Sequence, residues 1–255
     1  MKALQIFLLV LIIIGLGLIF TRDKWVPKLI QVILSQDSNG PYMPIFELDK
    51  EPNTNTISIT PVSIKEENFT GIKSVLSGSG LLVLEAQKYI DSTVAEFKTQ
   101  ADRDVPDMRK QFGADNPTAN YTLDVLAKEY KSTKYNAVII SVYTFTGGAH
   151  GSSYYKVFNT TLGGDKILSL SDVIKKEKQT AFTELVKKEL NAWRPDGTIV
   201  VFPETVTELT FASFKSWNLD DKNINIYFDQ YEIGPGVLGA VVFPISLEKI
   251  KDLLN

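Results

Sequence analysis

The pattern of hydrophobic and polar positions first separates an uncharged N-terminal run from the rest of the chain. Residues 3–20 carry no charged side chain and are interrupted only by Gln5 and two glycines. As a helix this run would span about 27 Å, close to the thickness of the hydrocarbon core of a bilayer. We therefore predict a transmembrane anchor in residues 1–20, with a cleaved secretory signal as the alternative. The run is not followed by a small-x-small cleavage site, which favours the anchor.

Three further segments follow this run. Residues 35–55 contain Asn-Gly-Pro, Met-Pro, Glu-Pro and Asn-Thr-Asn, which is linker composition, and we expect residues 21–54 to form a juxtamembrane linker. We expect a strand–helix–strand module in residues 55–134 and a C-terminal α+β domain in residues 135–255. Basic residues after the run oppose an outside C-terminus, but an N-terminal apolar run is ordinarily an export signal. The expected location is the bacterial cell membrane, single-pass, with the large domain extracytoplasmic, or secreted after cleavage.

The module at 55–134 shows both the alternation that is typical of strands and the spacings of three and four that are typical of helices. Alternation over residues 57–64 predicts an edge strand, because Pro61 cannot donate to a ladder. Alternation over residues 121–127 predicts a second strand. Between them, spacings of three and four predict a long amphipathic helix that Pro106 should kink or split near Asp104. Its apolar stripe comprises Ile90, Val94, Phe97, Ala101, Val105, Met108 and Phe112.

The C-terminal region predicts a strand meander followed by helices and more strands. Its expected strands are 135–145, 154–161, 167–170, 209–213, 223–228 and 237–243. A helix is expected to end near Trp193, and Ser246 can cap a terminal helix over residues 247–254. The first strands should be sequential antiparallel neighbours. The expected fold class is α+β, with helices packed on antiparallel sheets.

Composition narrows the possible chemistry. Hydrophobic residues make up 44% and charged residues 22%, with a formal charge of −3, which is typical of a globular chain that does not bind nucleic acid. The absence of cysteine excludes thiolate chemistry, and a single histidine excludes the usual zinc sites with two or three histidines. Phosphate-loop, dinucleotide and nucleophile-elbow motifs are absent. We predict no catalytic residue, no cofactor and no metal ligand.

The single histidine, His150, lies in the glycine-rich segment Tyr143-Thr-Phe-Thr-Gly-Gly-Ala-His-Gly151, which follows a strongly β-forming run. Two interpretations stay open. Its ring nitrogens could bond to backbone groups and fix a glycine turn, or His150 could act as a base or ligand. The loop 229–236 offers a second candidate, because Tyr231 and Glu232 could either close onto the sheet or bind a ligand.

Three segments carry a family resemblance: 143–151, 158–174 and 231–245. Together they resemble a bacterial extracytoplasmic domain of unknown function. This domain forms the outer part of the anti-sigma factor RsiV and accompanies the catalytic domain of the peptidoglycan deacetylase PdaC. The resemblance covers residues 135–255, and residues 55–134 look like the module that usually precedes it. The motif residues that may be carried over are Tyr143, Phe145, Gly147, Gly148, His150, Tyr231, Glu232 and Pro235.

The resemblance implies an α+β fold outside the membrane, and RsiV uses this domain to bind lysozyme. Only a few residues precede the apolar run, so we expect no sigma factor as a partner. The Asp and His motifs of the deacetylase domain are also missing. The predicted function is a membrane-anchored, non-catalytic binding or sensory module for cell-wall glycan or for a wall-directed protein such as lysozyme. The alternative is a glycan hydrolase or deacetylase-related enzyme that uses carboxylates near His150.

Overall fold

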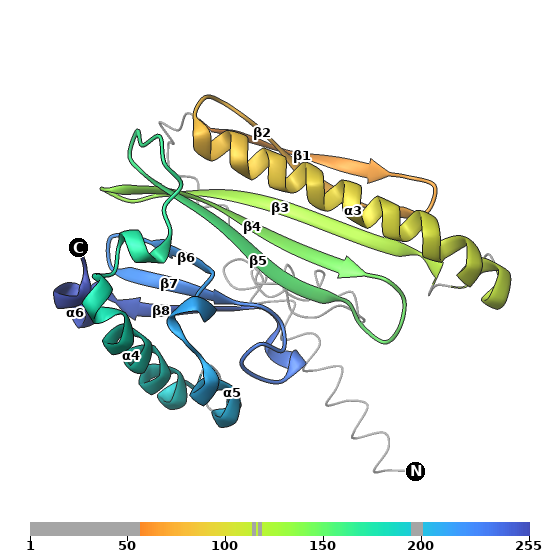
Figure 1. The fold of residues 1–255 in the computed structure, drawn as a ribbon. Coiled ribbons are helices and arrows are strands. Elements are labelled where there is room, and N and C mark those ends of the chain that lie inside the picture. Colours follow the sequence, from red (N-terminus) through yellow and green to blue (C-terminus); the bar gives the residue numbers. More distant parts are fainter. Residues whose placement is uncertain (1–56, 114–115, 117–118, 195–200) are drawn as a thin grey trace, which may run out of the picture. The chain divides into compact units, whose positions relative to one another are not determined.

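A five-stranded sheet forms the larger part of the structure, a computed structural model that describes residues 57–113, 116, 119–194 and 201–255 (Figure 1). The strands follow one another in chain order across the sheet. They are β1 (Ser58–Lys65), β2 (Phe69–Ser77), β3 (Tyr121–Lys131), β4 (Tyr135–Phe145) and β5 (Ser152–Thr161). The predicted edge position of the first strand is confirmed. The strand β2 was missed by the sequence analysis.

The sheet is mixed, so the expectation of purely antiparallel sheets is wrong. β2 and β3 pair in parallel, while the other neighbours are antiparallel. The helix α3 (Leu81–Phe112) makes the long crossover that a parallel pair requires. The strands approach so closely that a side chain at Gly71 would collide with the carbonyl group of Leu123. The fold is therefore α+β with one mixed and one antiparallel sheet.

α3 lies along one face of this sheet (Figure 1). The predicted division of the helix at Pro106 is wrong, because α3 continues through this residue. A proline removes one hydrogen-bond donor from a helix, but buried Ala101 and Val105 precede it and pack in the core with strand residues such as Leu123 and Val125. Burial of this apolar stripe maintains the helix despite the lost bond. The predicted boundary at residue 134 falls in the turn between the paired strands β3 and β4.

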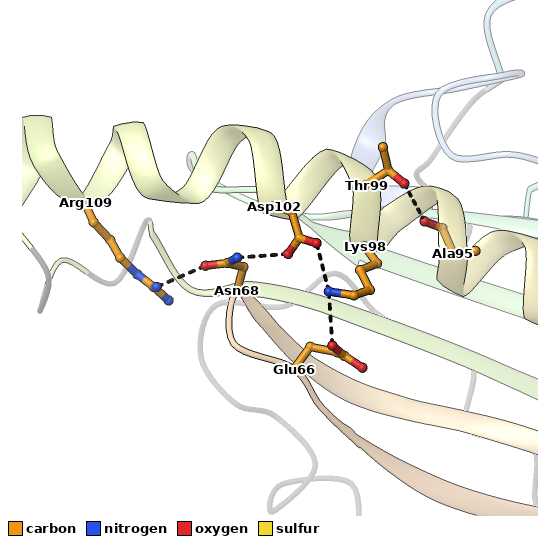
Figure 2. A network of polar contacts seen from close by, with 7 residues as sticks. All are labelled: Glu66, Asn68, Ala95, Lys98, Thr99, Asp102 and Arg109. Atoms are coloured by element: carbon orange, nitrogen blue, oxygen red, sulfur yellow. Dashed lines mark hydrogen bonds and ion pairs between the residues drawn. The ribbon is translucent and has the colours of Figure 1, made fainter.

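A polar network fixes α3 to the turn between β1 and β2 (Figure 2). Buried Asn68 donates to Asp102 Oδ1 at 2.9 Å and accepts from Arg109 at 3.1 Å. Lys98 lies 2.8 Å from Asp102 Oδ2 and 3.2 Å from Glu66 Oε2. The neighbouring ammonium group of Lys98, with a bond from Asn68, lowers the pKa of Asp102. Asn68 thus bonds to two turns of the helix at once.

Replacing Asn68 by alanine should lower the free energy of unfolding by about 1–3 kcal/mol, because it leaves part-buried partners without their bonds. Thr99→Ala is the matched control, since its hydroxyl makes only an exposed bond to the Ala95 carbonyl within the same helix. Urea denaturation of both variants measures the difference. Equal loss in the two would contradict the role of Asn68.

The rest of the described chain forms a smaller antiparallel sheet and the helices that pack with it. Its strands are β6 (Ser216–Leu219), β7 (Asn223–Phe228) and β8 (Val241–Ser246). The helices α4 (Gln179–Ala192) and α5 (Pro203–Glu208) supply the other side of its core. α6 (Leu247–Ile250) follows β8, and Ser246 Oγ accepts the Glu248 N–H at 3.3 Å. The predicted Ser246 cap is confirmed.

Three predicted strands of this part are corrected. Residues 167–170 are not a strand and lead into a 3-10 turn at Leu170–Asp172, and residues 209–213 contain a 3-10 turn at Phe211–Ser213. Both turns begin with capping boxes, so side chains bond the backbone groups that a strand would use. The last strand begins at Val241, because Gly236–Leu238 forms another 3-10 turn. β6 was not predicted.

Asp172 holds the first of these turns together. Its Oδ2 accepts the Ser169 N–H at 2.8 Å and the Ser169 hydroxyl at 2.7 Å, and the Lys166 ammonium group bonds to Oδ1. The Lys166 bond, followed by the two from Ser169, lowers the pKa of Asp172 to about 2 from 3.8. The charged form is thus the one that the fold stabilises.

Because the folded pKa lies below the unfolded one, this stabilisation is present above pH 3.8 and is lost as the pH falls through about 2. We expect Asp172→Asn to be less stable than the natural protein at about pH 5, and the difference to shrink towards pH 2. Urea denaturation at both pH values measures this difference in the free energy of unfolding, with Asp165→Asn, an exposed residue of the preceding loop, as control. A difference that does not change with pH would contradict this account.

The outer edge of β5 joins the two sheets through side chains of the smaller one. Gln230 donates its N–H to the Ser153 carbonyl and accepts the Ser153 N–H through Oε1, both at 3.0 Å. The Tyr155 N–H donates to Asp229 Oδ1 at 3.3 Å, and its carbonyl accepts from Ser216 Oγ at 3.0 Å. These bonds fix the start of the loop between β7 and β8.

Among the described residues, no helix combines the length and the apolar character needed to cross a membrane. The predicted anchor at residues 1–20 and the predicted linker at residues 21–54 lie outside the described part of the chain.

Candidate functional site

Two loops that are far apart in the sequence meet at an exposed pair of aromatic side chains. His150 lies in the turn between β4 and β5, and Tyr231 lies in the loop between β7 and β8. The hydroxyl of Tyr231 lies 2.9 Å from His150 Nε2, and the ring centroids are 5.9 Å apart. His150 is exposed, and Tyr231 is 51% exposed. We call these two residues the His150–Tyr231 pair.

The glycines around His150 shape its turn. Gly147 and Gly148 have φ values of 85° and 98°, which L side chains rarely adopt. Gly151 is required for a different reason, because a side chain there would collide with the ring of Tyr143. His150 Nδ1 lies 2.9 Å from the Gly151 carbonyl oxygen. The turn therefore fixes the ring of His150 through its own backbone.

Tyr231 is held in a strained conformation. Its φ of 71° makes it the only non-glycine residue with positive φ in the described part of the chain. Such a conformation costs about 1–3 kcal/mol and persists only where the surroundings enforce it. Gln230 provides this restraint, since it bonds to Ser153 and donates Nε2–H to the Gly236 carbonyl at 3.1 Å. The ring of Tyr231 lies so close to Gly236 that a side chain there would collide with it.

Two carboxylates flank Tyr231. Glu232 Oε2 accepts the Asp229 N–H at 2.7 Å, and the Asp229 carbonyl accepts the Glu232 N–H at 3.0 Å. Desolvation raises the pKa of both carboxyl groups, and the charge of Asp229 raises that of Glu232 further. Lys215 opposes both shifts. The loop thus carries acidic groups beside an exposed ring.

The remaining predicted residues have supporting positions. Tyr143 is half-buried on β4, and burial raises the pKa of its hydroxyl. Phe145 ends β4 opposite Thr122, and Pro235 precedes the 3-10 turn of the loop. The sequence analysis did not single out Asp229 and Gln230, whose bonds position Tyr231. Only their place at the end of a strand could have indicated this role.

The tautomer of His150 follows from its partners. The Gly151 carbonyl can only accept, so Nδ1 carries the proton in the neutral ring, and Nε2 accepts from the Tyr231 hydroxyl. No carboxylate bonds to either nitrogen within the described residues. The hydrolase alternative required two carboxylates beside His150, and it gains no supporting contact. The described residues also contain no group of three potential metal-binding side chains.

Comparison with known proteins identifies part of the chain. Residues 171–248 match the family model described as protein of unknown function DUF3298. The matched residues include the loop of Tyr231 but not the turn of His150. The resemblance to a domain of unknown function is thereby confirmed.

The peptidoglycan-N-acetylmuramic acid deacetylase PdaC of Bacillus subtilis (strain 168) is 26% identical to this chain over 177 residues. The match covers 65% of this chain and 36% of PdaC, so the chain spans about a third of that relative. The relationship to PdaC is therefore distant and partial, as the resemblance implied.

One solved structure shows the same fold, and a second is reported beside it. A DUF3298 family member from Bacteroides fragilis NCTC 9343 matches with a TM-score of 0.56 at 19% identity, over 80% of this chain and 95% of that one. A DUF3298 family protein from Pseudomonas aeruginosa PAO1 gives a TM-score of 0.49 at 16% identity, over 78% and 93% of the two chains. The Bacteroides structure supports the α+β architecture.

The single histidine makes the His150–Tyr231 pair directly observable by NMR. In Tyr231→Phe we expect the Nε2 resonance of His150 to move, because its hydrogen-bond donor is lost, while Nδ1 keeps its bond to Gly151. Long-range ¹H–¹⁵N correlation spectra measure both nitrogens. Tyr130→Phe, an exposed tyrosine on β3, is the control and should leave them unchanged. An unshifted Nε2 resonance in Tyr231→Phe would exclude the pair in solution.

Proposed function

We propose that this protein is a membrane-anchored, extracytoplasmic and non-catalytic module that binds cell-wall glycan through the His150–Tyr231 pair. One observation carries the proposal: a half-exposed tyrosine is held in a strained backbone conformation beside an exposed histidine. Backbone strain of this kind concentrates at functional sites, and exposed aromatic residues on loops are favoured contacts for ligands.

The rigid surroundings support binding rather than a purely structural role. Gln230 and Asp229 fix the loop to the β5 edge, so the ring of Tyr231 loses little freedom when a ligand arrives. A tyrosine offers an apolar face and a polar hydroxyl, which suits a sugar with both apolar and hydroxyl-bearing faces.

The comparison with PdaC and the apolar N-terminal run support the proposed location and ligand class. PdaC is named for its action on peptidoglycan N-acetylmuramic acid, and it matches 65% of the present chain. The apolar run at residues 3–20 supplies the membrane anchor of the proposal. A wall-directed protein such as lysozyme is the competing ligand, and the experiment below distinguishes the two.

Titration calorimetry of the purified protein with solubilised peptidoglycan fragments should show binding that Tyr231→Ala weakens about tenfold or more. His150→Ala should weaken it as well, while costing about 1 kcal/mol of stability or less because the ring is exposed. Tyr130→Ala, another exposed tyrosine, should bind as the natural protein does.

Absence of glycan binding would overturn the proposal. Binding of lysozyme alone, with the same dependence on Tyr231, would assign the surface to a wall-directed protein. Release of reducing sugar or acetate from peptidoglycan by the purified protein would show that the module is catalytic.

A further inference from the structure

We propose that the His150–Tyr231 surface selects among wall saccharides by charge: it accepts neutral and amine-bearing sugars and disfavours sugars that carry a carboxylate. This inference rests on the proposed function, because it concerns the ligand class of the same surface. The selection follows from two properties of the groups around Tyr231: they accept hydrogen bonds, and they carry negative charge.

The Gly151 carbonyl determines which groups of the His150–Tyr231 pair donate and which accept a hydrogen bond. In the neutral ring His150 Nδ1 donates to this carbonyl, so Nε2 accepts and the Tyr231 hydroxyl donates its proton to Nε2. The oxygen of Tyr231 keeps its lone pairs on a side chain that is 51% exposed. A ligand that meets this oxygen therefore has to donate a hydrogen bond. Sugar hydroxyls, amides and ammonium groups can do so, whereas a carboxylate cannot.

The flanking carboxylates are hydrogen-bond acceptors as well. Asp229 uses Oδ1 to accept the Tyr155 N–H, and Glu232 uses Oε2 to accept the Asp229 N–H. No described residue donates to Asp229 Oδ2 or to Glu232 Oε1. Asp229 is exposed and Glu232 is half-buried, so both residues add acceptor oxygens to the loop that carries Tyr231.

The local charge reinforces this selection. Two carboxylates flank Tyr231, and Lys215 is the cation that acts on both of them. The neighbourhood therefore carries an excess of negative charge. Like charges repel more strongly where water is partly displaced, so the free lactyl carboxylate of a muramic acid residue without its peptide is disfavoured, whereas a lactyl group in amide linkage to peptide carries no charge there. The ammonium group of a glucosamine residue is attracted by the same field.

Titration calorimetry with three saccharides of equal length tests this selection. The probes are a tetramer of N-acetylglucosamine, a tetramer of glucosamine, and a tetrasaccharide of alternating N-acetylglucosamine and N-acetylmuramic acid without peptide. The natural protein should bind the neutral and the amine-bearing tetramers about tenfold or more tightly than the carboxylate-bearing one.

The double variant Asp229→Asn with Glu232→Gln should narrow this preference to within about threefold. Each replacement keeps an oxygen that can accept the Tyr155 or Asp229 N–H, so the loop can keep its shape, and the His150 resonances report whether it does. The matched control is Asp107→Asn with Glu248→Gln, which removes two charges from exposed ion pairs on α3 and α6. The control should leave the preference unchanged.

The outcomes separate this inference from the proposed function. Failure of all three saccharides to bind overturns both. Equal or tighter binding of the carboxylate-bearing tetrasaccharide, or an unchanged preference in the double variant, overturns the charge selection and leaves glycan binding intact.

Discussion

The rest of the structure depends on how the outer edge of β5 satisfies its hydrogen bonds. An edge strand presents a row of backbone donors and acceptors that need partners when they are buried. Here side chains and one loop of the smaller sheet supply these partners, chiefly Gln230, Asp229 and Ser216. Asn159, also on β5, donates to the Trp217 carbonyl at 2.6 Å. The two sheets are therefore joined by specific bonds as well as by the packing of Tyr155 against Tyr227.

The same bonds create the candidate site. Asp229 and Gln230 leave β7 and bond at once to β5, which forces the chain to turn sharply at Tyr231. The turn places the ring of Tyr231 beside His150, whose own turn follows β4. Tyr231 is thus a solvent-exposed residue whose backbone conformation is set by the bonds to β5. A binding surface at this point inherits the rigidity of both sheets.

Local patterns in the sequence explain why some elements were predicted. β3 and β5 alternate clearly, β4 contains a continuous apolar run, and the stripe of α3 repeats at helical spacing. β2 was missed because Gly71 and the polar residues around it weaken the strand pattern, and its parallel partner comes only after α3. The capping boxes at Ser169 and Thr210 converted apparent strands into turns. Tertiary packing decided the continuity of α3 at Pro106.

The site was predictable only in its parts. The glycine turn and the Tyr-Glu-Ile loop could be recognised by their residues, whereas the contact between His150 and Tyr231 joins positions 81 residues apart. No periodicity could show this contact, because it depends on which strand edge the loop covers. The roles of Asp229 and Gln230 were hidden for the same reason.

The two edges of the larger sheet also bear on self-association. β5 is closed by the side chains of the smaller sheet, and β1 forms the opposite edge. Pro61 removes a donor from the middle of β1, and most residues of this strand are exposed. Neither edge offers an uninterrupted ladder to a second chain, so growth of aggregates by strand addition is disfavoured at both ends.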